Sequence, residues 1–133
     1  MTIDLSGLIT PADKLREAKE RKRSEITAAC QAAIDGGFFF DGHHYDSDQR
    51  SQTNIIGTCN AVAAGVPLPE GFIWRTADNQ DVPMDVAGII ALGAALLAHI
   101  NAQYAKSWQL KAMADQAESM GDLSDITWQT HAE

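Results

Sequence analysis

The sequence predicts a small α+β domain in which two β-hairpins alternate with three helices, the last of them long. Its length of 133 residues, with 45% hydrophobic and 21% charged residues, is typical of one globular domain. Two short β-prone stretches each fold back at a turn signal, and apolar residues three and four apart before, between and after them predict helices. We therefore expect an amino-terminal arm over residues 1–10 and a single α+β domain with a carboxy-terminal helical extension over 11–133.

The first helix is predicted to begin at Thr10-Pro11. Thr10 can cap the helix, and proline fits the first helical position. The pattern continues to Ile34, and Gly36-Gly37 provides a stop. An apolar stripe in the second half predicts a core-facing surface that comprises Ile26, Ala29, Cys30 and Ala33. The first half is mostly charged, so we expect it to lie in solvent or to meet a partner.

The first hairpin is predicted in the string GGFFFDGHHYDSD, over residues 36–48. Asp41-Gly42 is typical of a type I′ turn, whose two central residues both need positive φ. This turn pairs Phe40 with His43, and it places His43 and His44 on opposite faces of the strand. Two histidines on opposite faces cannot bind one metal ion, so we expect no metal site here. Asp46-Ser47-Asp48 is predicted to cap the next helix.

A second helix is predicted from about Asp48 to Ala64, and Gly65 is its stop. Its core-facing residues are expected to be Ser51, Ile55, Cys59 and Val62. The strands of the second hairpin are predicted over 72–76 and 81–84, and Pro83 indicates an edge position. Because an isolated hairpin is only marginally stable, the two hairpins should share a sheet or lie on the helices.

The last helix is predicted to begin after a cap at Asp85 and to reach Met120, with Gly121 as its end. Its core-facing seam is expected to comprise Val86, Ile90, Gly93, Leu97, Ile100 and Tyr104. The apolar run Val86–Ala98 is shorter than the about 20 residues that span a membrane. We therefore interpret it as a buried helix segment. Leu123 to Trp128 is predicted to form a short amphipathic ending.

The far end of this helix is the predicted partner-binding site. A helix from Val86 to Met120 would be about 52 Å long. A compact domain of this size has a radius of about 14 Å, so the end of the helix must overhang or fold back. A second apolar seam lies in this part and comprises Leu110, Met113, Ala117 and Met120. Together with two tryptophans outside the core seam, it gives the predicted partner-binding residues Trp108, Leu110, Met113, Met120 and Trp128.

No nucleophile motif, phosphate-binding loop, dinucleotide fingerprint or zinc-protease motif occurs in the sequence. His43 and Asp46 could form an acid–base pair, but no third group completes it. His99 lies among leucines and is expected to be a satisfied core or interface histidine. The two cysteines, Cys30 and Cys59, have neither zinc spacing nor a disulfide framework, so we expect buried thiols in a reducing cytoplasm. We expect no enzymatic activity and no cofactor.

The charge distribution also limits the choice of partner. The net charge is −8; residues 1–23 hold six basic and four acidic residues, and the remainder holds four basic and fourteen acidic residues. Arg16, Lys19 and Arg23 share one helical face and could contact phosphates. Glu17 and Glu25 lie four residues from Arg21 and favour a solvated, ion-paired helix instead. We therefore expect no nucleic-acid binding, and the first residues contain no signal peptide and indicate no membrane association.

Four strings resemble a domain of unknown function that tailed phages and prophages encode. They are KRSEITAA (22–29), FFFDGHHYDSD (38–48), WRTADNQDVPMD (74–85) and ALGAALLAHI (91–100). Family members often accompany tail-fibre genes, and some look like tail-fibre assembly chaperones or small virion accessories. Chaperone-like members often carry another module upstream, whereas only residues 1–21 precede the match here.

The resemblance implies a non-enzymatic protein that binds a phage tail or tail-fibre protein, either as an assembly chaperone or as a virion component. It would act in the host cell cytoplasm during assembly or remain in the virion tail, and it could also bind a second copy of itself. The alternative from a different class is a small cytoplasmic enzyme or nucleic-acid-binding regulator that uses the hairpin at 38–48 or the basic first helix.

Overall fold

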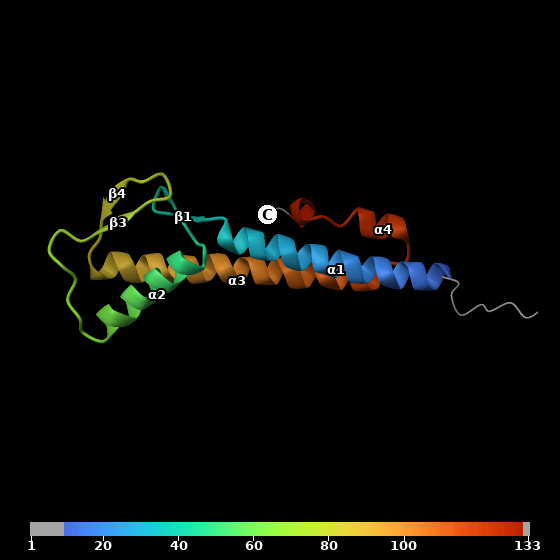
Figure 1. Cartoon of the computed structure of the whole chain (residues 1–133), viewed down its shortest axis with the longest axis horizontal. Coiled ribbons are helices and arrows are strands. Elements are labelled where there is room, and N and C mark those ends of the chain that lie inside the picture. Colours follow the sequence, from blue (N-terminus) through green and yellow to red (C-terminus); the bar gives the residue numbers. More distant parts are fainter. Residues whose placement is uncertain (1–9, 132–133) are drawn as a thin grey trace, which may run out of the picture. The chain divides into compact units, whose positions relative to one another are not determined.

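The structure is a computed structural model that describes residues 10–131 (Figure 1). Its helices are α1 (Pro11–Asp35), α2 (Gln49–Ala63), α3 (Val86–Gln116), α4 (Met120–Ser124) and the short 3-10 helix η1 (Trp128–His131). Its strands are β1 (Phe38–Phe40), β2 (His43–Tyr45), β3 (Ile73–Arg75) and β4 (Asp81–Pro83). This confirms the α+β class and the predicted order of helix, hairpin, helix, hairpin and long helix.

The chain divides into two compact units. Unit 1 joins Met1–Cys30 with Ala105–Glu133, and unit 2 is Gln31–Tyr104. Each unit has a hydrophobic cluster of its own. Helices α1 and α3 supply residues to both units.

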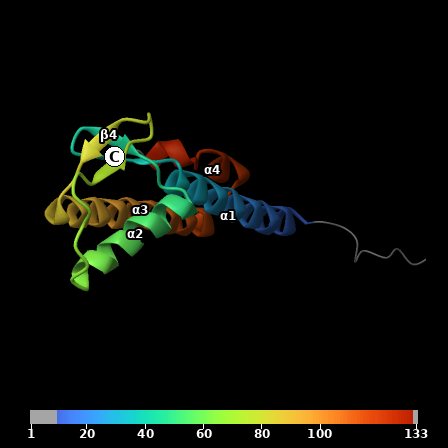
Figure 2. The same ribbon diagram turned by 60° about the vertical axis from the view of Figure 1, so that its left-hand side comes forward.

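The cluster of unit 2 is built by both hairpins, α2 and the first part of α3. In Figures 1 and 2 the hairpins and α2 gather around this part of α3. The buried residues of the cluster are Phe38, Tyr45, Ile55, Ile89, Leu92 and Leu96. Phe72 and Trp74 of the second hairpin pack against the cluster from its edge. The two hairpins form separate two-stranded sheets, so they do not share a sheet and instead lie on the helices.

The first hairpin has the predicted register and turn. Phe40 pairs with His43, and Phe38 pairs with Tyr45. Asp41 has φ of 49° and Gly42 has φ of 81°, so both central residues have the positive φ that a type I′ turn requires. One backbone hydrogen bond, from the Ala77 amide to the His44 carbonyl (2.8 Å), links this hairpin to the second one.

Ser47 has a different role from the predicted helix cap. It is fully buried, and its hydroxyl donates to the Ile34 carbonyl (2.6 Å) and accepts from the Gly37 amide (2.7 Å). It thereby satisfies backbone groups at the end of α1, which α-helices otherwise leave without partners. Asp48 is the residue before α2, but its carboxylate accepts from the Ser51 hydroxyl and makes no bond to a helix amide.

The orientation of α3 differs from the prediction. Its buried residues in unit 2 are Ile89, Leu92 and Leu96, which lie one position away from the predicted seam. The seam residues themselves are largely exposed, with Leu97 at 58% and Ile90 at 48%. α3 carries apolar residues on two neighbouring stripes, so the packing partners decide which stripe is buried. In unit 2 these partners are α2 and the hairpins.

Unit 1 is built by the first part of α1, the last part of α3 and the segment that follows α3. Its buried cluster comprises Ala18, Ile26, Leu110, Ala114, Ala117, Leu123 and Ile126. α3 ends at Gln116 instead of Met120, and Ser119 then caps α4 by accepting a hydrogen bond from the Asp122 amide (3.0 Å). Gly121 therefore lies inside α4, and the chain turns so that Leu123 and Ile126 are buried.

The amino-terminal cap of α1 forms as predicted. The Asp13 amide donates to the Thr10 hydroxyl (3.1 Å), and the Thr10 amide donates to the Asp13 carboxylate (3.3 Å). Hydrogen bonding to Thr10 holds the pKa of the Asp13 carboxyl below its ordinary value. The charged half of α1 does not simply extend into solvent, because Ala18 is buried in the cluster of unit 1.

Candidate functional site

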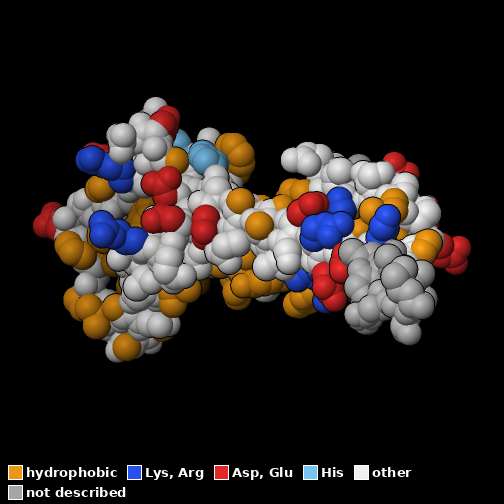
Figure 3. Space-filling model, turned by 45° about the vertical axis from the view of Figure 1, so that its right-hand side comes forward, with side chains coloured by type: hydrophobic (Ala, Val, Ile, Leu, Met, Phe, Trp, Pro, Cys, Tyr) orange, Lys and Arg blue, Asp and Glu red, His pale blue; other side chains and the backbone are white. Residues whose placement is uncertain are grey.

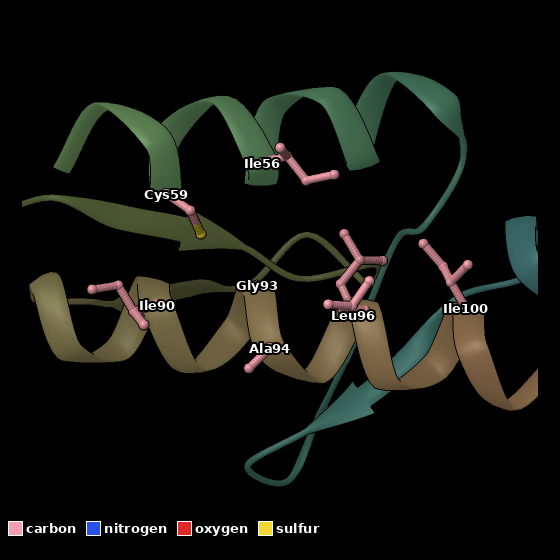
Figure 4. Close-up of a pocket in the computed structure, with 8 residues that line it drawn as sticks. Ile56, Cys59, Ile90, Gly93, Ala94, Leu96 and Ile100 are labelled. Carbon is pink, nitrogen blue, oxygen red and sulfur yellow. The ribbon is translucent and has the colours of Figure 1, made fainter. Parts of the chain in front are cut away.

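An apolar groove between α2 and α3 is the main candidate site. It lies within unit 2, has a volume of about 380 Å³, and is shown in Figure 4. Its lining residues are Ile56, Cys59, Ile90, Gly93, Ala94, Leu96, Leu97 and Ile100. Every side chain in this set is aliphatic or a thiol. The groove can therefore bury apolar groups but offers no side-chain acid, base or carboxylate to a reaction.

The floor of the groove depends on a close approach between α2 and α3. A Cβ atom on Gly93 would lie 2.5 Å from the Cys59 sulfur, so this position has room only for glycine. The Cys59 thiol donates to the Ile89 carbonyl (3.2 Å), and burial raises the pKa of this thiol. Cys59 is therefore a half-buried packing residue and is less buried than predicted, and its raised pKa makes the thiol unsuited to nucleophilic chemistry.

The rim of the groove consists of exposed aliphatic side chains. Ile56 on α2 and Ile90 on α3 are each 48% exposed, and Leu97 and Val86 are exposed on the same stripe of α3. We call these four residues together with Ala94 the α2–α3 face. The sequence contains no Asp, Glu, Lys or Arg over 51–69 or over 86–105. This face is therefore both apolar and uncharged.

The predicted partner-binding residues do not form one surface. Leu110 is fully buried in the cluster of unit 1, and Trp128 packs against the same cluster, with the Lys106 ammonium 4.4 Å from the centre of its ring. Leu110 therefore cannot contact a partner while this cluster is intact. Trp108, Met113 and Met120 are exposed, at 66%, 49% and 52%. The predicted overhanging seam is wrong for Leu110 and Ala117, because the segment after α3 covers both of them.

The sequence pattern did not identify the α2–α3 face as a site. The signal was present: α3 is apolar on two stripes, and a small domain can cover only one of them. The helical period predicts that Val86, Ile90 and Leu97 face the core, whereas the structure leaves them exposed.

Three of the four histidines, His43, His44 and His99, lie in or beside the first hairpin. His44 packs against the Phe39 ring (4.7 Å between ring centres), and His43 lies edge-on to Tyr45. Both line a shallow hollow with Asp78 and Gln80, and Asp46 is not among its lining residues. In residues 10–131 no three His, Cys, Asp or Glu side chains come close enough to hold a metal ion. His99 is satisfied as predicted: its Nε2 lies 3.1 Å from the Ile34 carbonyl, and its ring stacks on Phe38.

The basic stripe of α1 is engaged within the chain. Arg16 pairs with Asp13 (3.0 Å), and Arg23 pairs with Asp115 of α3 (2.8 Å). Lys19 donates to the Asp115 carbonyl (2.9 Å). On the face in Figure 3 basic and acidic side chains lie next to one another. The stripe therefore presents little unpaired positive charge to a phosphate backbone.

Among the described residues, the structure does not show the two ion pairs that Arg21 is expected to form with Glu17 and Glu25, and Glu25 pairs with a different residue. Glu25 pairs with Lys22 (3.2 Å) and not with Arg21, and within the described part of the chain Arg21 lies within 4.0 Å of no carboxylate. The Lys22 ammonium also donates to the Ile126 carbonyl (2.9 Å). Lys22 thus helps to hold the segment after α4 in unit 1.

By length and composition, α3 could cross a membrane, and only 17% of its most apolar 18-residue window is buried. Core helices of soluble proteins satisfy the same criterion, so this observation alone does not identify a membrane span. Between Val86 and Ala98 only Ile89, Leu92 and Leu96 are buried, which contradicts the interpretation of this stretch as a buried segment.

Comparison with protein-family models gives a match over most of the chain. A family model described as a domain of unknown function (DUF4376) matches residues 17–130. Searches of curated proteins and of solved structures found no similar chain. The match covers the described helices almost completely and includes both hairpins.

Proposed function

Because the chain belongs to the DUF4376 family of domains of unknown function, we propose its function from the surface that it exposes. The chain is a non-enzymatic protein-binding protein, and its partner is a phage tail or tail-fibre protein. It acts in the host cell during assembly, either as a chaperone or as a component that stays in the virion. The partner class rests on the resemblance to phage-encoded domains, and protein binding rests on the α2–α3 face.

The exposed aliphatic rim of the groove is the observation that carries this proposal. Contiguous exposed apolar surface is rare on monomeric proteins and marks interaction sites. Here Ile56, Ile90 and Leu97 border a groove whose walls have no charged residue. Side chains of this kind bind another apolar surface, in the way that an amphipathic helix fills a hydrophobic groove.

The other function classes have weaker support in the described residues. An enzyme at the hairpin would need a general acid or base with an orienting partner. His43 and His44 instead contact aromatic rings, and the hollow beside them is open. A nucleic-acid-binding role would need free basic side chains, whereas Arg16, Lys19 and Arg23 contact Asp13 and Asp115. We therefore propose neither a catalytic nor a nucleic-acid-binding role.

Capture of tail proteins tests the proposed function. A tagged chain is produced in cells in which the phage or prophage is induced, and the bound proteins are identified by mass spectrometry. We expect tail or tail-fibre proteins with the wild type and none with Leu97→Glu, because a carboxylate cannot be buried in an apolar contact without a large cost.

A matched variant locates the binding surface. Met113→Glu changes a residue of similar exposure in unit 1. If Met113→Glu loses the tail proteins and Leu97→Glu keeps them, the partner binds unit 1. Capture of no tail protein by the wild type contradicts the proposed function. Salt-sensitive binding of DNA or RNA at physiological salt would instead favour the nucleic-acid-binding class.

A further inference from the structure

We propose that the α2–α3 face is the contact between two copies of this chain, with α3 of one copy packed against α3 of the other about a two-fold axis. This inference rests on the proposed function, because it uses the same protein-binding face: a second copy covers the face until a tail protein displaces it. It uses residues of unit 2 only, and it differs from the predicted contact through Leu110 and Met113.

The spacing of the exposed residues is the first argument. Val86, Ile90 and Leu97 follow each other at intervals of four and seven on the exposed side of α3, whereas Gly93 between them faces α2. This is the spacing of the apolar seam along which two helices interlock. The same spacing led to the prediction that these residues face the core. A different stripe of α3 packs in the core. The stripe that contains Val86, Ile90 and Leu97 is therefore left exposed, and a second helix can pack against it.

The surface is also complementary to itself. Each copy has a projecting aliphatic row and, beside it, a groove of about 380 Å³ with Ala94 in its lining. The Leu97 side chain of one copy can enter the groove of the other, and the small Ala94 allows the two helices to approach closely. In a two-fold contact the same patch serves both copies, so one knob and one groove per chain are sufficient.

Charge is the third argument for a second copy. Each chain carries a net charge of −8, so two copies repel each other wherever acidic surfaces meet. The segments 51–69 and 86–105 supply both walls of the groove and contain no charged residue. Contact at this face brings no like charges together.

The size of the face is at the lower end of the range for a specific interface. The part of α3 from Val86 to Tyr104 is about 27 Å long. With α2 alongside, the strip is about 20 Å wide, because packed helices lie 8–10 Å apart. A strip of this size is within a factor of two of the about 800 Å² per partner that a standard stable interface buries.

The oligomeric state of the purified full-length chain tests the inference. We expect light scattering after size exclusion to give twice the monomer mass of 14.4 kDa. Leu97→Glu and Ile90→Glu should raise the dimer dissociation constant by about 100-fold or more, while circular dichroism shows that each variant remains folded. Met113→Glu, the matched control in unit 1, should remain a dimer.

A cross-link tests the geometry. A cysteine introduced at Ala94, in a chain whose Cys30 and Cys59 are changed to serine, should form an intermolecular disulfide under mild oxidation. A cysteine at Gln109, an exposed position of α3 in unit 1, should not. A wild-type chain that stays at the monomer mass at every concentration overturns the inference, and so does a dimer that survives both glutamate substitutions.

Failure of the inference can be distinguished from failure of the proposed function. A monomeric wild type from which Leu97→Glu removes tail-protein capture overturns the dimer and leaves the proposed function in place. A dimer that Leu97→Glu dissociates supports the inference, whether or not a tail protein is captured. A monomer that binds phosphatidylcholine vesicles through Leu97 overturns both, because the face then contacts lipid.

Discussion

The two units of the chain both expose large apolar side chains, but only unit 2 does so without charge. In unit 1 the exposed Trp108 and Met113 share their part of α3 with Lys106, Lys111 and Asp115. In unit 2 the exposed Ile90 and Leu97 belong to a stretch, 86–105, with no charged residue. Exposure alone therefore does not distinguish a docking face on this chain. The combination of exposure with absence of charge does.

The hydrophobic clusters of the two units also differ in the side chains at their borders. The cluster of unit 1 is rich in alanine, and lysine and arginine side chains cover its borders: Lys22 reaches the Ile126 carbonyl, and Arg23 reaches Asp115. The cluster of unit 2 contains Phe38, Tyr45 and large aliphatic residues, and its border on α3 is aliphatic as well. Polar side chains of unit 1 thus lie over the border of its own cluster. The border of the unit 2 cluster on α3 is apolar and exposed.

The largest expected effect separates neighbouring leucines on α3. Leu96 is buried and Leu97 is exposed, so Leu96→Ala should lower the free energy of unfolding by about 3 kcal/mol, because it leaves a cavity. Leu97→Ala should change it by less than about 0.5 kcal/mol when measured on the monomer. Leu110 and Met113 should show the same contrast in unit 1. Urea unfolding measures all four variants. Equal losses for Leu96→Ala and Leu97→Ala would mean that the α2–α3 face is not exposed.

A smaller effect is expected where α2 meets α3. Gly93→Ala should destabilise the chain by about 1–3 kcal/mol, because its Cβ would lie 2.5 Å from the Cys59 sulfur. The control is Gly57→Ala on α2, where nothing lies within 4 Å of the new Cβ; it should stabilise the helix by up to about 1 kcal/mol. Thermal unfolding measures both variants.

A double mutant tests the cause of the Gly93 effect. In Cys59→Ala the sulfur is removed, and the nearest remaining atom, the Cβ at position 59, lies 3.8 Å from the new methyl group. Gly93→Ala should therefore cost much less in this background. If its cost is the same with and without the sulfur, the contact between α2 and α3 does not have the geometry described.

The smallest effect concerns Tyr45 in the cluster of unit 2. Its hydroxyl is buried and has no hydrogen-bond partner within residues 10–131. Tyr45→Phe should therefore leave the free energy of unfolding unchanged or raise it by about 1 kcal/mol. A loss of more than 1 kcal/mol would indicate a partner for the hydroxyl.

The pH dependence of the same variant gives a second test. Burial and then the nearby Asp41 raise the pKa of Tyr45 above its ordinary value of 10.0. The folded chain therefore retains this proton longer than the unfolded chain. The contribution of Tyr45 to stability is complete below pH about 10 and decreases as the pH rises further. Melting temperatures measured above that pH should fall less steeply for Tyr45→Phe than for the wild type.

Local signals predicted most of the fold. Thr10-Pro11 and Gly36-Gly37 bound α1, and Asp41-Gly42 determines the register of the first hairpin, because these signals act through neighbouring backbone atoms. The inward stripe of α3 could not be predicted in this way, because two neighbouring apolar stripes satisfy the same helical period. Which stripe is buried depends on α2 and the hairpins, and their packing is a long-range property.

The end of α3 was missed for a different reason. The spacing of Leu110, Met113, Ala117 and Met120 indicated that the helix continues. However, Ser119 and Asp122 have the spacing of a capping pair, and the structure starts α4 there. This pair predicts the break in the helix. The burial of Leu110 and Ala117 depends on how the following segment packs, and a local capping signal does not contain that information.

The placement of acidic residues away from the groove has a consequence for colloidal behaviour. With a net charge of −8, approaching molecules repel each other overall, and the α2–α3 face adds no charge to this repulsion, so association should stop once two faces are in contact. This repulsion disappears near the isoelectric point of about 4.8. Near that pH the solubility of the chain should therefore fall, because the acidic surface keeps the chain dispersed at neutral pH.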